Sequence, residues 1–181
     1  MPVFRPTLEV PSVIISVIGG NEPPPEAIRK AEEVGRELAR RGIIVACGGM
    51  AGVMEAVCRG AKEGGGTTIG ILPGRDGGQA NRWVDIPICT DMGYARNAIV
   101  AYTGQAVIAI DGSYGTVSEM CYALRADIPV IGLDTWTLFR NGEADDKMIV
   151  ALNPVDAVDK AVAAAEEGLK TASAQPRMTS G

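Results

Sequence analysis

The chain has 181 residues, 46% of them apolar, a formal net charge of -5 and no histidine. This length suits one domain that can bury a sheet between helices. The negative charge gives no long-range attraction for nucleic acid or an acidic membrane surface, so we expect neither as a partner. Because histidine is absent, Ser-His-Asp and Cys-His catalysis and the usual zinc sites are excluded, and we expect no metal site.

The predicted location is cytoplasmic. No apolar run approaches the roughly 20 residues that span a bilayer, and the first residues lack the basic and apolar regions of a signal peptide. The four cysteines, Cys47, Cys58, Cys89 and Cys121, form no C-x-x-C pair. Such spacing fits reduced thiols in the cytoplasm.

Strands and helices are expected to alternate along the chain. Residues 1–11 contain several prolines and are predicted to form a flexible arm, followed by a folded domain over residues 12–168. Short apolar runs predict strands at 13–18, 43–47, 67–72, 84–89, 105–110 and 129–133. Helical spacing of apolar residues predicts helices at 25–41, 52–63, 93–102 and 155–168, and residues 169–181 are expected to form a disordered tail.

Continuously apolar strands separated by amphipathic helices are typical of a parallel sheet covered on both faces. The predicted fold class is therefore α/β, a single Rossmann-like three-layer domain with a mainly parallel sheet. Ligands in such folds bind at the carboxyl ends of the strands.

Three glycine-bearing turns follow three of the predicted strands. They contain Gly19 and Gly20; Gly48, Gly49, Met50 and Gly52; and Gly112, Ser113, Tyr114 and Gly115. Each alone is compatible with a purely structural turn. Together they predict a floor of backbone donors at one edge of the sheet. None matches the dinucleotide fingerprint or the Walker A pattern, which disfavours NAD dehydrogenases and P-loop NTPases.

The third turn leads from a buried strand into a helix, and two interpretations of it stay open. In the first, backbone N–H groups of the turn and of Thr116 bind a phosphate, because helix N-termini attract anions, and Glu119 places an acid beside it. In the second, Thr116 and Glu119 form a capping box and the turn is structural.

Arg96 stands near the start of the expected helix 93–102. Its side chain either points into the cleft or lies on the surface with its stem over apolar groups.

Several motifs in this order resemble the LOG-like proteins, once labelled "possible lysine decarboxylase". They are C-G-G-M-A-G-V-M-E from position 47, the segment around Met92 and Arg96, D-G-S-Y-G-T-V-S-E from position 111 and I-P-V-I-G-L from position 128. The family includes cytokinin-activating phosphoribohydrolases and molybdenum cofactor carrier proteins. The resemblance covers residues 13–136, and its most specific motif, P-G-G-x-G-T-x-x-E, is met at Gly112, Gly115, Thr116 and Glu119.

The chain departs from the hydrolases at three positions. Asp111 replaces their proline, Ser113 their second glycine, and Asn97 the lysine that follows their arginine. These changes make the expected pocket less positive, so the chain looks closer to the carrier-like, DprA/Smf-related branch.

The resemblance implies two alternatives for a small phosphorylated ligand. In a hydrolase, Glu119 and Arg96 act in cleaving the N-glycosidic bond of a nucleoside 5'-monophosphate, and Thr116 and the glycine loop hold the phosphate. In a carrier or sensor, the same loops hold a nucleotide or the molybdenum cofactor as cargo without turnover. No cofactor is required in either case. A third alternative, a structural or interaction module, predicts no ligand at the loops.

The decarboxylase label does not fit the chain, because its five lysines lie in helical, tail or surface-like contexts unsuited to a pyridoxal phosphate Schiff base. The resemblance and the apolar helix 93–102 together predict a homodimer or homotetramer.

Overall fold

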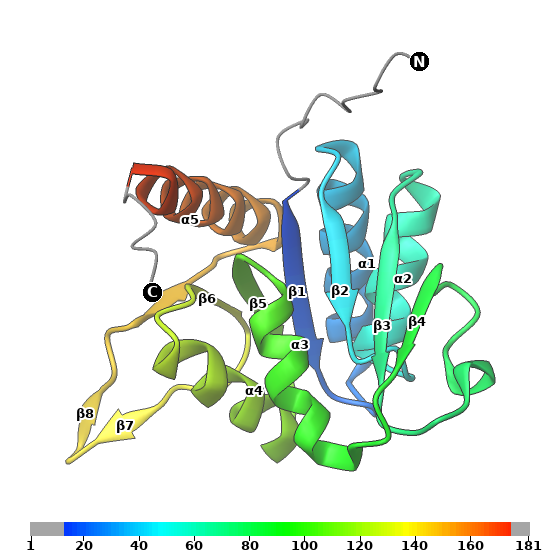
Figure 1. Ribbon diagram of the computed structural model, residues 1–181. Helices are drawn as coiled ribbons and strands as arrows, with labels where there is room; N and C mark the ends of the chain where they lie inside the picture. The colour runs from blue at the N-terminus through cyan, green and yellow to red at the C-terminus, as the bar shows by residue number, and fades with distance from the viewer. Residues whose placement is uncertain (1–12, 175–181) are drawn as a thin grey trace, which may run out of the picture.

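A computed structural model describes residues 13–174 (Figure 1). In this part of the chain seven strands form one sheet, all parallel, in the order β4-β3-β2-β1-β5-β6-β9. The strands are β1 (Ile14–Gly19), β2 (Ile44–Cys47), β3 (Thr68–Leu72), β4 (Ile86–Cys89), β5 (Ala106–Ile110), β6 (Val130–Leu133) and β9 (Met148–Val150). The predicted α/β fold with a parallel sheet is thus confirmed.

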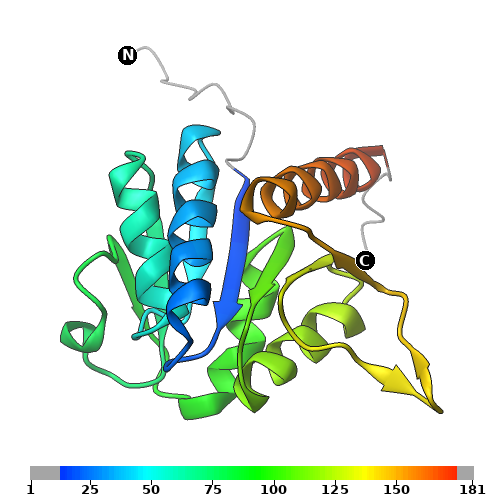
Figure 2. The same cartoon turned by 180° about the vertical axis from the view of Figure 1, so that it is seen from behind.

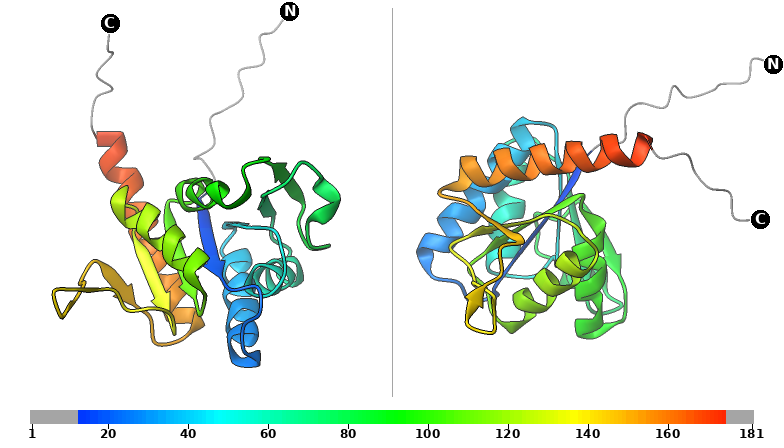
Figure 3. Two further views of the ribbon diagram at one scale, coloured as in Figure 1. Left: turned by 90° about the horizontal axis from the view of Figure 1, so that it is seen from below. Right: turned by 90° about the vertical axis from the view of Figure 1, so that its left-hand side faces the viewer.

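Helices cover both faces of the sheet. They are α1 (Pro25–Arg40), α2 (Val53–Glu63), α3 (Asn97–Thr103), α4 (Tyr114–Arg125) and α5 (Pro154–Ala174). Helices α1, α2 and α5 contribute to one buried cluster, and α3 and α4 to the other. Figures 1 and 2 show these two layers from opposite sides, and the right-hand view of Figure 3 shows α1 and α2 across the sheet from α3 and α4.

The order in which the strands are added to the sheet reverses between β1 and β5. The chain builds outward from β1 to β4, then returns to place β5 on the other side of β1. Residues Ile15–Gly19 pair with Ala106–Ile110, so the carboxyl ends of both strands meet. Such a switch point is where open α/β sheets bind ligands.

Two glycines let α1 and α2 pack closely. A Cβ at Gly60 would lie 1.9 Å from the carbonyl oxygen of Glu32, and one at Gly35 would lie 2.1 Å from that of Val57. Neither distance can accommodate a side chain, so the backbones of the two helices approach directly.

The C-terminal helix is longer than predicted. Helix α5 continues past Gly168 to Ala174, so the prediction of a disordered tail from residue 169 is wrong for residues 169–174. Glycine inside a helix costs only about 0.5–1 kcal/mol, and the Thr171 hydroxyl donates to the carbonyl of Glu167 in the continuing turn. The remaining residues of the expected tail and the expected arm 1–11 lie outside the described residues.

Some elements were not predicted. Strand β9 extends the sheet beyond β6, and the two-residue strands β7 (Phe139–Arg140) and β8 (Glu143–Ala144) form a separate hairpin. The expected helix 93–102 divides into a 3-10 turn, η2 (Gly93–Arg96), and α3, while η1 (Gly77–Gln79) lies between β3 and β4. Among the described helices, none has the length and apolar character needed to cross a membrane.

Candidate functional site

A pocket of about 670 Å³ opens at the carboxyl edge of the sheet, within the size range of small-molecule sites. It lies at the switch point, between the end of β1, the η2–α3 segment and the first turns of α4. Its lining residues are Gly19, Asn21, Met54, Tyr94, Ala95, Arg96, Asn97, Ser113, Tyr114, Gly115, Thr116, Ser118, Glu119 and Tyr122.

The N-terminus of α4 forms one wall of the pocket. Ser113 is the N-cap in extended conformation, and no side-chain capping bond is made there within the described residues. Thr116 is the third residue of the helix and is buried, so the capping-box alternative with Thr116 as cap is wrong. The backbone N–H groups of the first turn lack intrahelical partners and border the pocket, as an anion site requires.

Glu119 and Arg96 meet at the floor of the pocket. Their residues are only 7% and 9% exposed, and Arg96 Nη1 lies 3.8 Å from Glu119 Oε1. Burial raises the pKa of Glu119 to about 8, although the guanidinium of Arg96 acts in the opposite direction. Glu119 is therefore mainly protonated near neutral pH.

Arg96 Nη1 is buried and has no hydrogen-bond partner among the described residues. Burial also lowers the pKa of Arg96, an effect that Glu119 opposes. A buried guanidinium with an unused donor is costly unless an acceptor reaches it. Arg96 therefore lines the pocket as a buried cation, and the surface alternative for this side chain is wrong.

Gly48 makes the room that Arg96 occupies. A Cβ at position 48 would lie 2.2 Å from Arg96 Nη1 and 2.6 Å from Met54 Sδ. Gly48 is not among the residues that line the pocket, so its contribution to the site is to position the arginine.

The other residues of the second glycine turn pack against neighbouring backbone segments. Gly52 has a φ of 67°, and a Cβ there would lie 2.3 Å from the carbonyl oxygen of Gly20. Gly49 packs against the backbone of Gly70, and the Met50 carbonyl accepts a hydrogen bond from the Asn81 side chain. Of the three glycine-bearing turns, the first contributes Gly19 to the pocket lining and the third contributes residues 113–116. Gly20, Gly48, Gly49, Met50, Gly52 and Gly112 lie outside the lining of this pocket.

Asn97 also lines the pocket, although the sequence analysis singled it out only as a departure from the hydrolases and not as a site residue. Its side-chain amide donates to Ser118 Oγ at 2.9 Å and to the Gly115 carbonyl at 3.4 Å. The Ser118 hydroxyl in turn donates to the same carbonyl. Asn97 thus fastens α3 to the first turn of α4, where the hydrolases have a lysine.

Two further lining residues on α4 were not predicted, although their helical spacing from Gly115 places them on the face that carries Glu119. Ser118 and Tyr122 lie three and seven positions after Gly115, on the same face of α4 as Glu119. Asn21, Met54 and Tyr94 come from other segments and could be found only from the fold.

Neither a metal cluster nor a Schiff-base lysine is found in the described part of the chain. No group of three histidine, cysteine or acidic residues there could hold a metal ion. None of its lysines lines the pocket, and Lys30, Lys62 and Lys160 pair with aspartates on the surface.

Fold and pocket together define a doubly wound α/β protein with a ligand-sized pocket at the switch point of its sheet. Residues 12–159 match the SLOG cluster4 family, and the chain belongs to that family. It is LOG-like, as its motifs indicated, and falls in the molybdenum cofactor carrier-like branch.

Two sequence relatives illustrate the range of the family. An uncharacterized protein from Archaeoglobus fulgidus is 45% identical over 111 residues, which cover 61% of this chain and 73% of the relative. A protein from Mycobacterium tuberculosis named cytokinin riboside 5'-monophosphate phosphoribohydrolase is 32% identical over 125 residues, covering 63% and 66%. The chain thus spans about two thirds of that hydrolase.

Solved structures of similar proteins cover more of the chain. The molybdenum cofactor binding protein from Rippkaea orientalis is 31% identical with a TM-score of 0.77, covering 86% of this chain and 98% of that one. The molybdenum cofactor carrier protein from Chlamydomonas reinhardtii is 32% identical with a TM-score of 0.72, covering 88% and 99%.

Proposed function

We propose that the pocket binds a small phosphorylated, nucleotide-like ligand, with its phosphate at the N-terminus of α4 and its sugar or sugar-like group towards Glu119. The observation that carries this proposal is the buried pair of Arg96 and Glu119, 3.8 Å apart, which lines the same pocket as the start of α4. Phosphate oxygens are among the acceptors that a guanidinium binds best, and sugar hydroxyl oxygens can also accept its hydrogen bonds. A mostly neutral Glu119 would not repel the anion.

The first candidate function is hydrolysis of the N-glycosidic bond of a nucleoside 5'-monophosphate. The bond between the sugar C1' and the base nitrogen breaks, a water oxygen bonds to C1', and the water proton ends on the base. Because the pKa of Glu119 is raised to about 8, both its forms are accessible near neutral pH. The ionised form would hold the water and stabilise the oxocarbenium-like state, as carboxylates do in glycosidases, while Arg96 orients it.

The second candidate function is a carrier or sensor that holds the ligand without turnover, with the molybdenum cofactor or a nucleotide as cargo. Asn97 favours it, because this residue ties α3 to α4 and leaves Arg96 as the one arginine or lysine that lines the pocket within residues 13–174. The two structural neighbours named for the molybdenum cofactor are covered almost completely by this chain.

A chromatographic assay for free base distinguishes the two candidates. AMP, GMP, CMP, UMP and an N6-substituted AMP are incubated with the protein and with Glu119→Gln, which keeps the shape of the neutral acid. Hydrolysis predicts base release that falls at least about 100-fold in the variant, as expected for loss of a positioned acid–base group. A carrier predicts no release from either protein, while the ligand raises the melting temperature of both. If no compound is cleaved and none raises the melting temperature, the proposed site is wrong.

We also propose that the protein forms a homodimer or homotetramer, because Ile86 and Ile88 on β4 and Tyr102 on α3 are exposed. The cytoplasmic location and the lack of nucleic-acid and membrane partners stay predictions from composition and charge.

A further inference from the structure

The loop between β5 and α4 also borders a second hollow. This hollow, about 260 Å³, is lined by Asp111, Gly112, Asp134, Thr135 and Trp136. Residues 113–116 of the same loop line the main pocket. A phosphate bound at the loop would therefore lie close to both hollows.

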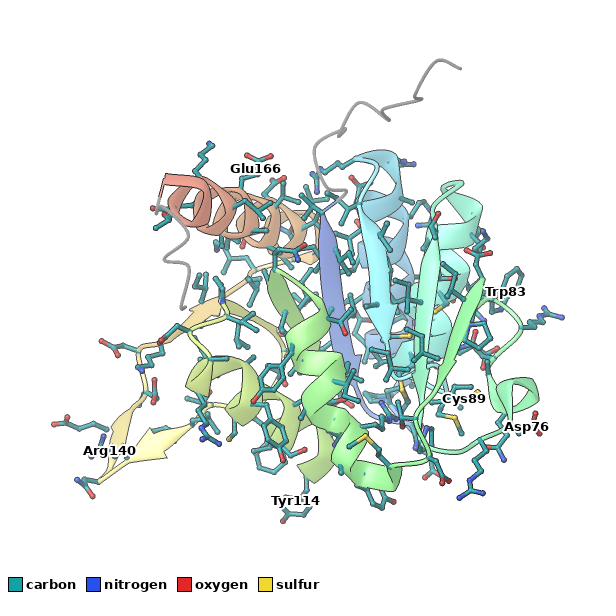
Figure 4. The ribbon with its side chains drawn as sticks, viewed as in Figure 1. Asp76, Trp83, Cys89, Tyr114, Arg140 and Glu166 are labelled. Atoms are coloured by element: carbon teal, nitrogen blue, oxygen red, sulfur yellow. The ribbon has the colours of Figure 1, made fainter. Side chains whose placement is uncertain are left out.

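Two aromatic rings, one from the lining of each hollow, contact each other. Tyr114 lines the main pocket and Trp136 the second one, and their ring centroids lie 5.7 Å apart with planes inclined by 41°. Tyr114 is 81% exposed and projects from the carboxyl edge of the sheet (Figure 4). Trp136 is 39% exposed. Large aromatic faces left in water beside a ligand pocket are suited to stacking on a planar ring.

The indole of Trp136 is held in place before any ligand arrives. Its Nε1 donates to the Gly112 carbonyl at 3.0 Å, and the neighbouring Thr135 hydroxyl donates to the carbonyl of Asp111. The ring is thus fastened to the anion-binding loop itself. A ring fixed in this way loses little conformational entropy when another ring stacks on it.

The carboxylates that line the second hollow restrict which ligand group can bind beside the Trp136 ring. Asp134 is paired with Lys30, and Asp111 stands at the turn with a φ of 50°. Carboxylates accept hydrogen bonds from sugar hydroxyls or ring N–H groups but repel a further phosphate. The second hollow therefore suits a neutral or cationic, donor-bearing group.

We propose that the ligand continues beyond its phosphate, across the loop from Gly112 to Gly115, and ends in a planar, donor-bearing ring that stacks on Trp136 and Tyr114. This inference rests on the proposed function and specifies it: the ligand class is a phosphate-bridged compound with groups on both sides of the bridge, as in a dinucleotide. Trp136 is then a specificity-determining residue of the site.

The first test reads the environment of Trp136 directly. Trp83, the other tryptophan, lies far from Tyr114 (Figure 4), so Trp83→Phe leaves Trp136 as the fluorescent reporter in the full chain. Ribose 5-phosphate has no ring, AMP has one on the sugar side, and NAD has rings on both sides of its pyrophosphate. We expect NAD to quench Trp136 and to bind more tightly than AMP, while AMP and ribose 5-phosphate bind without quenching it.

The second test uses Trp136→Leu in the otherwise natural chain. Loss of a stacking partner is expected to weaken NAD binding about 5- to 100-fold and to leave AMP binding unchanged. The matched control is Phe139→Leu, because Phe139 is 68% exposed and lines neither hollow. A purely structural tryptophan would instead weaken AMP and NAD binding alike.

The inference is overturned if AMP quenches Trp136 as strongly as NAD, if NAD binds no more tightly than AMP, or if Trp136→Leu affects both ligands equally. In each of these cases AMP still binds, so the proposed function stands. If neither AMP nor ribose 5-phosphate binds, the proposed function fails and this inference fails with it.

Discussion

At the scale of single residues, the site depends on a buried acid, Glu119, and a buried base, Arg96. Glu119 is pushed towards its neutral form by burial, and Arg96 keeps a charge that no described residue fully satisfies. Such perturbed groups in a pocket are typical of binding and catalytic sites.

The raised pKa of Glu119 predicts how stability depends on pH. Between about pH 4.5 and 8 the folded protein keeps a proton that the unfolded chain releases, so the free energy of unfolding falls as the pH rises through this range. Glu119→Gln cannot ionise and lacks this decline. At about pH 8.5 we expect the variant to be more stable than the natural protein by up to a few kcal/mol, since one pKa unit equals about 1.4 kcal/mol, and near pH 4.5 to be equal to it.

Thermal unfolding of both proteins across this pH range measures the difference. The control is Glu143→Gln, which makes the same chemical change at an exposed position on β8. Parallel pH profiles for Glu119→Gln and the natural protein would mean that Glu119 ionises normally in the folded state.

At this scale, part of the site could be predicted from the sequence. Glu119 and the residues 113–116 follow from one local motif, because a strand, a glycine turn and a helix start are adjacent in the chain. The support of Arg96 by Gly48 could not be predicted, since the two are 48 positions apart and meet only in the folded sheet.

At the scale of elements, the N-terminus of α4 is the part most directly tied to ligand binding. A Cβ at Gly115 would meet only Asn97 Nδ2, at 3.8 Å, so Gly115→Ala should fold normally. The added methyl group would lie in the lining of the pocket and separate a phosphate from the backbone N–H groups. We expect affinity for ribose 5-phosphate to fall about tenfold or more, as for the loss of one hydrogen bond to a charged group.

Titration calorimetry measures this effect, with Gly168→Ala as a distant glycine control. Unchanged affinity in Gly115→Ala would show that the phosphate does not bind at the start of α4.

The close contact of α1 and α2 predicts opposite effects for two glycine substitutions. Gly60→Ala forces a Cβ to within 1.9 Å of the Glu32 carbonyl oxygen, and overpacking of this kind costs about 1–3 kcal/mol. Gly168→Ala meets nothing within 4 Å inside α5 and should stabilise the protein by about 0.5–1 kcal/mol. Denaturant unfolding compares the two, and equal stability of both variants would contradict the described packing.

Elements with strong periodicity could be predicted within one or two residues, and weak ones could not. Helix α1 and strands β1 and β5 have long apolar patterns that lie at the centre of the fold. Strand β9 has only three residues and is partly exposed, so its pairing with β6 depends on tertiary contacts. Helix α5 passes Gly168 because one glycine is too weak a signal to end a helix of alanine-rich sequence.

At the scale of the whole molecule, the edge of the sheet at β4 is apolar and exposed. Ile86 and Ile88 are 48% and 42% exposed, and their register with Ile69 and Ile71 places them on one face of the sheet, the face that α3 and α4 cover further along. Exposed apolar surface of this kind commonly marks an interface.

We therefore predict a mass in solution of at least two chains, against 18.9 kDa for one. Ile88→Lys, which places a charge on this face, should shift the mass towards a single chain, because burying an unpaired charge is costly. Light scattering after size-exclusion chromatography measures both. A single-chain mass for the natural protein would contradict the proposed oligomer.

The most direct measurement is titration calorimetry of AMP and ribose 5-phosphate into the natural protein and Arg96→Met, near neutral pH. The variant keeps an unbranched apolar stem at position 96 and removes the charged guanidinium. We predict that both ligands bind the natural protein and that the variant binds them at least about tenfold more weakly, as for a lost charge-assisted hydrogen bond. Equal affinity in the variant, or no binding to the natural protein, would contradict a phosphorylated-ligand site at Arg96 and Glu119.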